Sequence, residues 1–584
     1  MAKLPSGKSE LLLGNEAVAR GAWEAGVLVA TAYPGTPSTE ILEAVAHYPE
    51  IHTEWCTNEK VALEVALGVS FAGGRALVAM KHVGLNVAAD PFFSASYIGA
   101  TGGLVIVSAD DPGCHSSQNE QDNRHYARAA KVPILEPSDS EEARRFTRIA
   151  FEMSERFDTP VLLRLTTRIS HSRSVVILKE RVEHPIPRYE KGFAKRVLLP
   201  MNARRRHRFV EERTARLQEF SESFDENRIE FQDKGIGVIT DSVAYQYVKE
   251  VLPEASILKL AMVWPFPDEK VKRFAGSVGR VVVVEENDPF IENEVRRLHL
   301  SPEGKEKIPI LGELNPTVVA DGLKIGFGEE DSPVVEGLPP RPPVMCPGCP
   351  HLGVFNIIKK LRLIAHGDIG CYTLGALLPL NAMDTCVDMG ASVGTAYGMQ
   401  LVSDKKTRKR VVAVIGDSTF FHSGITPLLN TYYNSGTGTV LILDNRTTAM
   451  TGHQGHPGTG KTLHKKAGKE VNLERLVRGI GIEEVFTIGP YDLEEIEEIL
   501  KREIGRDTLS VIIVRGFCTL LGEFERSDPF VVDEEICTGC LRCSLIGCPA
   551  ISIVNGKATI DRIICVGCTI CSQICPEGAI GEKR

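Results

Sequence analysis

The sequence lacks the features that mark membrane, secreted and nucleic-acid-binding proteins. No run of apolar residues approaches the roughly 20 that a membrane helix needs. Residues 1–10 lack the charged-then-apolar pattern of an export signal. The net charge is −9, so the chain as a whole is not built to hold the phosphates of a nucleic acid. We therefore expect a cytoplasmic protein that has neither a membrane nor a nucleic acid as a partner.

At 584 residues the chain is too long for one hydrophobic core, which predicts several domains. Short β-branched runs alternate with helical patterns in residues 1–194, 235–338 and 344–525. This alternation predicts a multidomain α/β fold with parallel sheets covered by helices on both faces. Residues 195–234 are basic and poor in apolar side chains, which predicts a solvated linker or helix. Residues 527–584 form a cysteine-rich tail.

The cysteine tail carries the strongest signal in the sequence. Eight of the fifteen cysteines stand in two runs of the form C-x2-C-x2-C, each followed by a further cysteine and a proline. Zinc usually takes two separated C-x2-C pairs, whereas three thiolates on one tight loop suit a 4Fe–4S cube. The runs resemble a bacterial two-cluster ferredoxin, whose fourth cysteine ligates the other cluster. That resemblance implies one cluster on Cys537, Cys540, Cys543 and Cys575, and a second on Cys565, Cys568, Cys571 and Cys548. The first run departs from the pattern by one extra residue before its fourth cysteine.

Two apolar runs in residues 344–525 end in polar side chains. Val411–Ile415 precedes Gly416, Asp417 and Ser418, and Val440–Leu443 precedes Asp444 and Asn445. The ends of parallel strands bind ligands, and a diphosphate there needs a hard cation held by oxygen atoms. The pattern resembles the thiamine-diphosphate signature, Gly-Asp-Gly followed some two dozen residues later by Asn-Asn. The resemblance implies Mg²⁺ ligands from the Asp417 and Asn445 side chains and the Thr447 carbonyl. Ser418 and Asp444 depart from the signature.

Neighbouring stretches resemble the 2-oxoacid:ferredoxin oxidoreductases more specifically. Met450–Gln454 is similar to their T-G-G-Q stretch beside the diphosphate, which implies cofactor contacts from Gly452 and Gln454. Cys346–His351 is similar to their Cys-x-x-Cys-x-His opening, which places His351 at the cofactor. In that family a cysteine quartet near the thiazolium holds a further cluster, here implied for Cys346, Cys349, Cys371 and Cys518. The alternative is one C-x2-C pair beside two unrelated buried cysteines.

The first segment contains the residues expected to activate the cofactor and to meet the substrate. Thiamine needs a carboxylic acid in a dry site, where burial raises its pKa so that it can share a proton. Glu59 opens a stretch that resembles the N-E-x-x-A-x-x-x-A-x-G helix of pyrimidine-binding domains, which implies this activating role. Taken alone, a Glu at a helix start is most often a partner of the helix dipole. Tyr33–Thr39 resembles the family's Y-P-x-T-P-S loop, in which Thr36 is expected to meet substrate and cofactor.

The resemblance covers nearly the whole chain. The order is pyrimidine-binding domain, transketolase-C-like domain, diphosphate-binding domain and ferredoxin domain, as in the larger subunit of indolepyruvate:ferredoxin oxidoreductase. It implies oxidation of arylpyruvates with coenzyme A, electron transfer to a soluble ferredoxin, and a smaller partner subunit with a γ-type domain. Three alternatives are open: a pyruvate or 2-oxoglutarate oxidoreductase, a non-oxidative thiamine-dependent decarboxylase, and an electron-carrying module with an inactive thiamine site. The substrate assignment rests on domain order alone.

Overall fold

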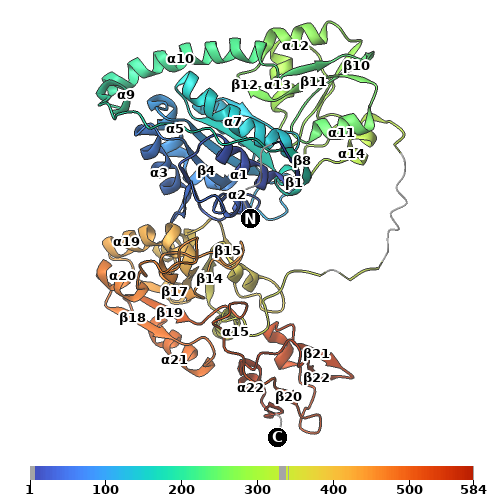
Figure 1. Ribbon diagram of the computed structural model, residues 1–584. Helices are drawn as coiled ribbons and strands as arrows, with labels where there is room; N and C mark the ends of the chain where they lie inside the picture. The colour runs from blue at the N-terminus through green and yellow to red at the C-terminus, as the bar shows by residue number, and fades with distance from the viewer. Residues whose placement is uncertain (1–6, 328–336, 340, 583–584) are drawn as a thin grey trace. The chain divides into compact units, whose positions relative to one another are not determined.

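The computed structural model describes residues 7–327, 337–339 and 341–582. The chain forms two compact units, Met1–Pro333 and Val334–Arg584. The first unit is coloured from blue to green in Figure 1, and the second from yellow to red. The predicted boundary between residues 338 and 344 falls partly outside the described residues.

The first unit contains a seven-stranded sheet in the order β12-β6-β7-β5-β4-β2-β3. Every neighbouring pair is parallel except β12 and β6. The strands are β2 (Val29–Ala32), β3 (His52–Trp55), β4 (Ala76–Lys81), β5 (Leu104–Asp110), β6 (Ile134–Leu135), β7 (Val161–Thr166) and β12 (Met262–Trp264). Every residue of β4, β5 and β7 is buried, as a sheet covered by helices on both faces requires. The covering helices include α1 (Gly14–Glu24), α3 (Glu59–Phe71), α5 (Ala89–Ile98) and α7 (Ser140–Phe157).

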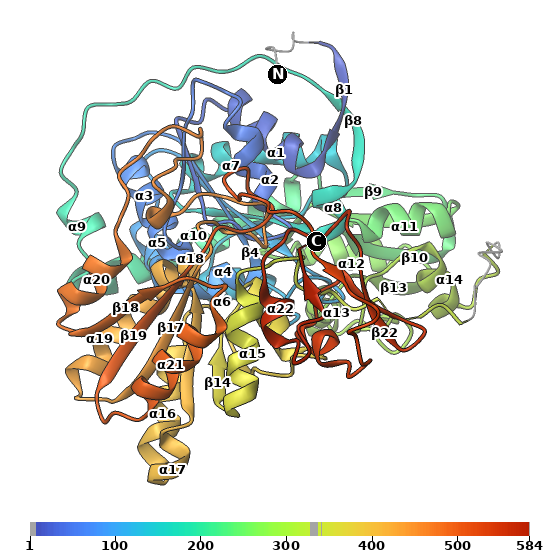
Figure 2. The ribbon, with the colours of Figure 1, turned by 90° about the horizontal axis from the view of Figure 1, so that it is seen from below.

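A short antiparallel ribbon and a second sheet complete this unit. In Figure 2, β1 (Ser9–Leu13) and β8 (Arg173–Ile177) lie side by side and pair antiparallel. The second sheet has the order β13-β10-β11-β9. Its strands are β9 (Arg228–Glu230), β10 (Asp233–Asp241), β11 (Ala255–Leu260) and β13 (Arg280–Val284), and its helices include α11 (Ala244–Val251), α12 (Asp268–Ala275), α13 (Phe290–Arg297) and α14 (Pro316–Leu323).

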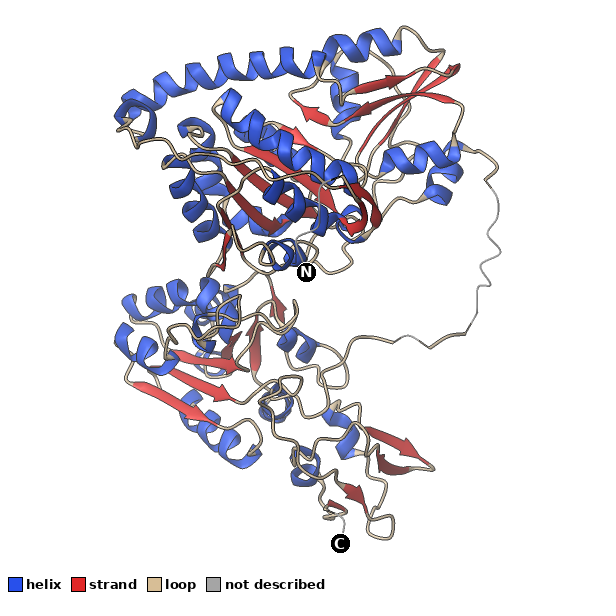
Figure 3. Ribbon diagram, in the orientation of Figure 1, coloured by secondary structure: helices blue, strands red, loops and turns tan. Residues whose placement is uncertain are grey.

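The segment predicted as a basic linker is mostly helical. Figure 3 shows it as the long helix α10 (Pro200–Ser223), which follows the short α9 (Phe193–Arg196). The helix begins with a proline at its first position, where the missing N–H costs no hydrogen bond. Its buried Val210, Arg213 and Leu217 attach it to the unit, while its other arginines are mostly exposed.

The second unit contains a fully parallel six-stranded sheet in the order β15-β14-β16-β17-β19-β18. The strands are β14 (Ile364–Gly367), β15 (Thr385–Cys386), β16 (Val411–Gly416), β17 (Gly438–Asp444), β18 (Glu484–Ile488) and β19 (Leu509–Arg515). The helices include α15 (His351–Leu361), α16 (Ala391–Val402), α18 (Asp417–Thr419), α19 (Ile425–Tyr433), α20 (Leu473–Ile480) and α21 (Leu493–Ile504). These parallel sheets confirm the predicted α/β class.

The cysteine-rich tail has little regular structure of its own. It contains two antiparallel strand pairs, β20 (Val531–Val532) with β23 (Ile580–Gly581) and β21 (Ile551–Val554) with β22 (Lys557–Ile560). The short helix α22 (Ile570–Ile574) follows β22 and precedes β23 in the chain. Within the described ranges, no helix has the length and apolar character needed to span a membrane.

Candidate functional site

Asp417 is the centre of the candidate diphosphate site. It follows β16 directly, and β16 and β17 are parallel neighbours, so Asp417 and Asn445 lie at the same edge of the sheet. The Asp417 side chain is 2% exposed. Its Oδ1 accepts the backbone N–H of Ser418 at 2.9 Å, and its Oδ2 accepts that of Arg446 at 2.9 Å. The structure thus brings both predicted side-chain magnesium ligands to one point of the fold.

The loop after β17 folds back on itself beside Asp417. Asn445 is buried, and its Oδ1 accepts the Thr447 N–H at 3.3 Å. Gln454 closes the loop: its carbonyl accepts the Thr448 N–H at 3.0 Å, and its side-chain amide donates to the Thr451 carbonyl at 2.9 Å. Gly452 has a φ of +121°, and a Cβ there would lie 2.9 Å from the Gln454 Nε2. The loop therefore needs glycine at this position.

The donor atoms at this edge fit a divalent cation. Asp444 is also buried, and its pKa is raised to about 6, first by burial and then by the neighbouring Asp417 charge. Its Oδ2 pairs with the Arg515 Nε at 2.7 Å, whereas its buried Oδ1 has no hydrogen-bond partner among the described residues. Two buried carboxylates with an unpartnered oxygen, next to an amide oxygen, suit the hard oxygen-ligand set of Mg²⁺.

Sequence reasoning missed two aromatic residues of this site. His456 donates from Nε2 to the Asp417 Oδ2 at 3.0 Å, while its Nδ1 accepts the Gly458 N–H at 3.2 Å. Burial works to raise the pKa of Asp417, but the interactions with His456, Asp444 and the Ser418 N–H together outweigh it, and the pKa is lowered. Tyr372 packs so closely on Gly416 that a Cβ there would lie 2.7 Å from its ring. Neither residue stands in a motif, and only the position of His456 just after Gln454 and Gly455 could have suggested it.

The predicted His351 lies beside these residues. It begins α15, is 3% exposed, and meets the Tyr372 ring edge-on with centroids 6.1 Å apart. Burial lowers its pKa to about 4, with the Asp417 charge acting in the opposite direction. His351 is therefore a neutral imidazole at physiological pH, able to accept or donate a hydrogen bond.

The four cysteines predicted to form a proximal quartet converge. Cys349 interacts electrostatically with the thiols of Cys346, Cys371 and Cys518, which come from three separate segments. Burial raises the pKa of the Cys349 thiol well above its ordinary value. The Cys518 N–H donates to the Asn445 carbonyl at 3.1 Å, so the quartet is tied to the diphosphate loop by a backbone hydrogen bond. The four thiols thus lie in one group, and their binding of a cluster stays a prediction.

The eight tail cysteines sort into the two predicted quartets. One small pocket is lined by Cys548, Cys565, Cys568 and Cys571, and another by Cys537, Cys540, Cys543 and Cys575. The two cysteine loops are wound alike: φ is positive at Gly539 and Leu541 in one, and at Gly567 and Thr569 in the other. The loop accommodates the extra residue of the first run with a left-handed backbone conformation at Gly547, where φ is +77°.

The spacing of the sulfur atoms can be compared with the spacing that a single zinc ion would require. Four thiolates around one zinc ion, at about 2.3 Å each, would bring the sulfurs to roughly 3.8 Å from one another. Among the described residues, only Asp122, His125 and Asp288 form a group of three or more such side chains with all ligand atoms within 4.8 Å. In the part of the chain that the structure describes, no three cysteine sulfurs lie that close to one another. That the quartets hold iron–sulfur clusters stays a prediction.

Glu59 and Thr36 lie in the first unit. Glu59 is the first residue of α3, behind Asn58, whose side chain caps the helix by accepting the Val61 N–H at 3.0 Å. Its side chain is 6% exposed and packs against Gly84, where an added Cβ would lie 2.6 Å from the Glu59 Oε1. Thr36 is partly exposed in the loop after β2 and precedes a cis peptide bond to Pro37. The catalytic roles of both residues stay predictions.

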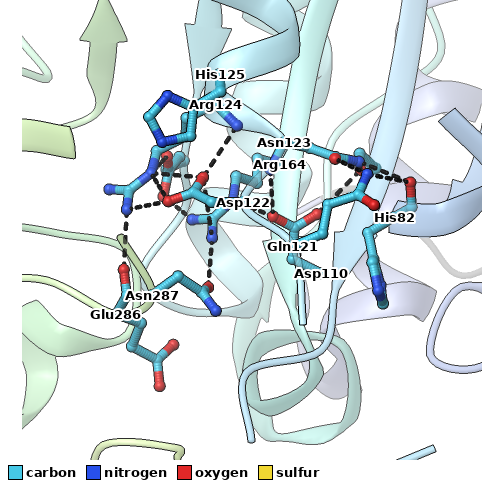
Figure 4. Close-up of polar contacts among 12 residues, drawn as sticks. His82, Asp110, Gln121, Asp122, Asn123, Arg124, His125, Arg164, Glu286 and Asn287 are labelled. Carbon is cyan, nitrogen blue, oxygen red and sulfur yellow. Dashed lines mark hydrogen bonds and ion pairs between the residues drawn. The ribbon is translucent and has the colours of Figure 1, made fainter. Parts of the chain in front are cut away.

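A buried polar network supports the start of the helix that contains Gly84 (Figure 4). The Asn123 amide donates to the His82 carbonyl at 3.0 Å, and the Asn123 N–H donates to Asp110 at 3.0 Å. Asp110 in turn pairs with the Arg164 Nε at 2.6 Å, and Arg164 reaches the Asn287 side chain at 2.9 Å. The start of α4 (His82–Val87) is therefore braced against the segment that contains Asn287.

Comparisons with known proteins identify the family of the chain. Residues 20–235 match the family model described as "Pyruvate flavodoxin/ferredoxin oxidoreductase, thiamine diP-bdg". Residues 368–514 match "Thiamine pyrophosphate enzyme, C-terminal TPP binding domain". Three similar relatives are named "Indolepyruvate oxidoreductase subunit IorA". That of Archaeoglobus fulgidus is 41% identical over 98% of this chain and 97% of its own length. Those of Pyrococcus horikoshii and Methanothermobacter thermautotrophicus are 40% and 41% identical, over 99% and 98% of this chain and 97% of each relative.

Proposed function

Because the chain belongs to the family of the IorA subunits of indolepyruvate oxidoreductases, we propose that it oxidatively decarboxylates indolepyruvate and other arylpyruvates. In the balanced reaction, the arylpyruvate and coenzyme A give an arylacetyl-coenzyme A, carbon dioxide and a proton. Two electrons leave singly through iron–sulfur clusters to two molecules of ferredoxin. A smaller subunit with a γ-type domain completes the enzyme, since the relatives are themselves named as subunits.

The observation that carries this proposal is the hydrogen bond between the Cys518 N–H and the Asn445 carbonyl. It joins a four-cysteine group to the loop that would bind the diphosphate. A non-oxidative decarboxylase keeps its electrons on the substrate, so it has no use for a redox centre at this position. An oxidoreductase needs an electron acceptor close to the cofactor, and this geometry supplies a place for one.

The chain's own residues have separate roles in this proposal. Thiamine diphosphate, when bound, supplies the electron sink for the loss of carbon dioxide. The Asp417 and Asn445 side chains and the Thr447 carbonyl would hold the Mg²⁺ that neutralises its diphosphate. Glu59 would hold a proton at the pyrimidine nitrogen, in a site that excludes water. Thr36 would contact the substrate.

The proposal is tested by anaerobic reduction of a viologen dye. The chain is purified with its smaller subunit and given indolepyruvate, phenylpyruvate, pyruvate or 2-oxoglutarate, each with and without coenzyme A. We expect coenzyme-A-dependent reduction that prefers the two aryl acids. Preference for pyruvate or 2-oxoglutarate would refute the substrate assignment. Aldehyde release without dye reduction would identify a decarboxylase, and the absence of bound thiamine diphosphate would identify an electron-carrying module.

A further inference from the structure

Lys81 is a buried cation that forms no ion pair with any residue that the structure describes. Its side chain, at the end of β4, is 8% exposed. Its Nζ donates to the Ser116 carbonyl at 2.7 Å and approaches the Ser116 hydroxyl at 3.5 Å. In the part of the chain that the structure describes, no carboxylate oxygen lies within 4.0 Å of it. The buried Arg124 and Lys259, by contrast, each pair with carboxylates. A buried ammonium without a counter-ion is costly unless other acceptors meet it, as two backbone carbonyls meet Lys270. Lys81 has one such carbonyl, which leaves room for an anion.

Lys81 stands between the two predicted catalytic positions. A Cβ added at Gly35 would lie 3.0 Å from the Lys81 Cβ, so the lysine stem packs directly on the loop that carries Thr36. Three residues after Lys81, Gly84 contacts the Glu59 carboxyl group. The network in Figure 4 fixes the intervening His82. The ammonium group is therefore held in a defined place beside the residues expected to meet substrate and cofactor.

Asp111, an acidic side chain that interacts electrostatically with Lys81, is hydrogen-bonded to other residues. Its Oδ2 accepts the Ser116 N–H at 2.9 Å and the Ser117 hydroxyl at 2.5 Å, and its Oδ1 accepts the Thr167 hydroxyl at 2.8 Å. Burial lowers the pKa of Lys81, and the Asp111 charge only partly opposes this. Asp111 thus shapes the loop that presents the Ser116 carbonyl, and the lysine keeps donor capacity for a ligand.

We propose that Lys81 binds the carboxylate of the 2-oxoacid substrate. This inference rests on the proposed function, in which each substrate carries one carboxylate next to its keto group. The ammonium donates a charge-assisted hydrogen bond to that carboxylate while Ser116 holds the side chain in place. The contact is made in the ground state, so its loss raises KM more than it lowers kcat.

The experiment compares Lys81→Met and Lys81→Arg in the complete enzyme by viologen reduction. We expect Lys81→Met to raise the KM for phenylpyruvate about 10- to 100-fold, leaving the KM for coenzyme A unchanged, and Lys81→Arg to restore most of the loss. Lys270→Met is the matched control: Lys270 is 7% exposed, and among the described residues its Nζ donates to the carbonyls of Phe224 and Asn227 alone. It should leave both KM values unchanged.

Two results would overturn the inference while leaving the proposed function intact. One is an active wild-type enzyme whose KM for phenylpyruvate is the same in Lys81→Met. The other is a fall in kcat alone, which would assign Lys81 to holding the Ser116 loop. If Lys81→Met does not fold, inhibition of the wild-type enzyme tests the inference instead. 3-Phenylpropionate should inhibit at least tenfold more strongly than its neutral amide, and equal inhibition by the two compounds refutes the inference. A wild type without coenzyme-A-dependent dye reduction would instead refute the proposed function.

Discussion

Gly84→Ala should inactivate the enzyme through Glu59. A Cβ at Gly84 would lie 2.6 Å from the Glu59 Oε1, 2.7 Å from its Cγ and 2.9 Å from its Cδ. Gly84 lies within the short helix α4, where alanine is intrinsically favoured over glycine, so any loss must come from this contact. The methyl group and the carboxyl group cannot occupy the same space, and the carboxyl group has to move.

The size of the movement follows from these distances. Ordinary contact begins at 3.4 Å, so the Glu59 Oε1 at 2.6 Å must retreat by about 0.8 Å. Misplacement of a catalytic group by about 1 Å costs roughly 100-fold in rate. We therefore expect kcat to fall about 100-fold with the iron content unchanged. Gly398→Ala is the matched control, because Gly398 lies within α16 and nothing stands within 4 Å of an added Cβ.

The assay is viologen reduction with phenylpyruvate and coenzyme A, together with iron content and thermal unfolding of each variant. Gly398→Ala should keep full activity and gain up to about 1 kcal/mol of stability. A Gly84→Ala enzyme within threefold of wild-type kcat would show that the Glu59 carboxyl position does not govern turnover. A Gly84→Ala protein that unfolds early would instead show that the contact is structural.

Three further predictions concern the proton donor, one cluster and the stability of the first unit. Glu59→Gln should keep its iron and lose turnover, measured by the same assay; unchanged turnover would exclude its activating role. Cys571→Ser should remove one cluster, seen as a partial loss of iron and of its electron paramagnetic resonance signal, and unchanged iron would contradict the quartet. Burial, and after it the Glu313 charge, raises the pKa of Glu286 from 4.5 to about 7, although other contacts oppose the shift. The folded state therefore favours the protonated form of Glu286. The stability of the first unit should therefore fall as pH rises from about 4.5 to about 7, by at most about 3 kcal/mol from this group. Glu286→Gln should unfold with a smaller difference between pH 5 and pH 8, and an unchanged difference would contradict this.

Sequence patterns predicted those parts of the molecule whose functional residues lie close together in the sequence. The cysteine runs of the tail and the strands that end next to Asp417 and Asn445 are each visible within one segment, and the helix that begins at Glu59 is expected from its resemblance to a pyrimidine-binding motif. Tertiary contacts decided the rest. His456 acts through a hydrogen bond to Asp417, 39 residues away, and no periodicity indicates that pairing. The basic stretch became a long helix because a few buried side chains, such as Arg213, attach it to the unit. Composition alone could not show this.

The antiparallel strand β12 has a consequence for how the chain is made. It supplies the outer edge of the first sheet, where Met262 pairs with Leu135 and Trp264 with Ile134. During synthesis, this edge of β6 therefore stays unpaired until β12 has been made, more than a hundred residues later. A fragment ending at residue 234 would leave that edge with unpaired backbone groups, a template for association between chains. The thiamine-binding segment cannot be treated as an autonomous piece when truncations are designed.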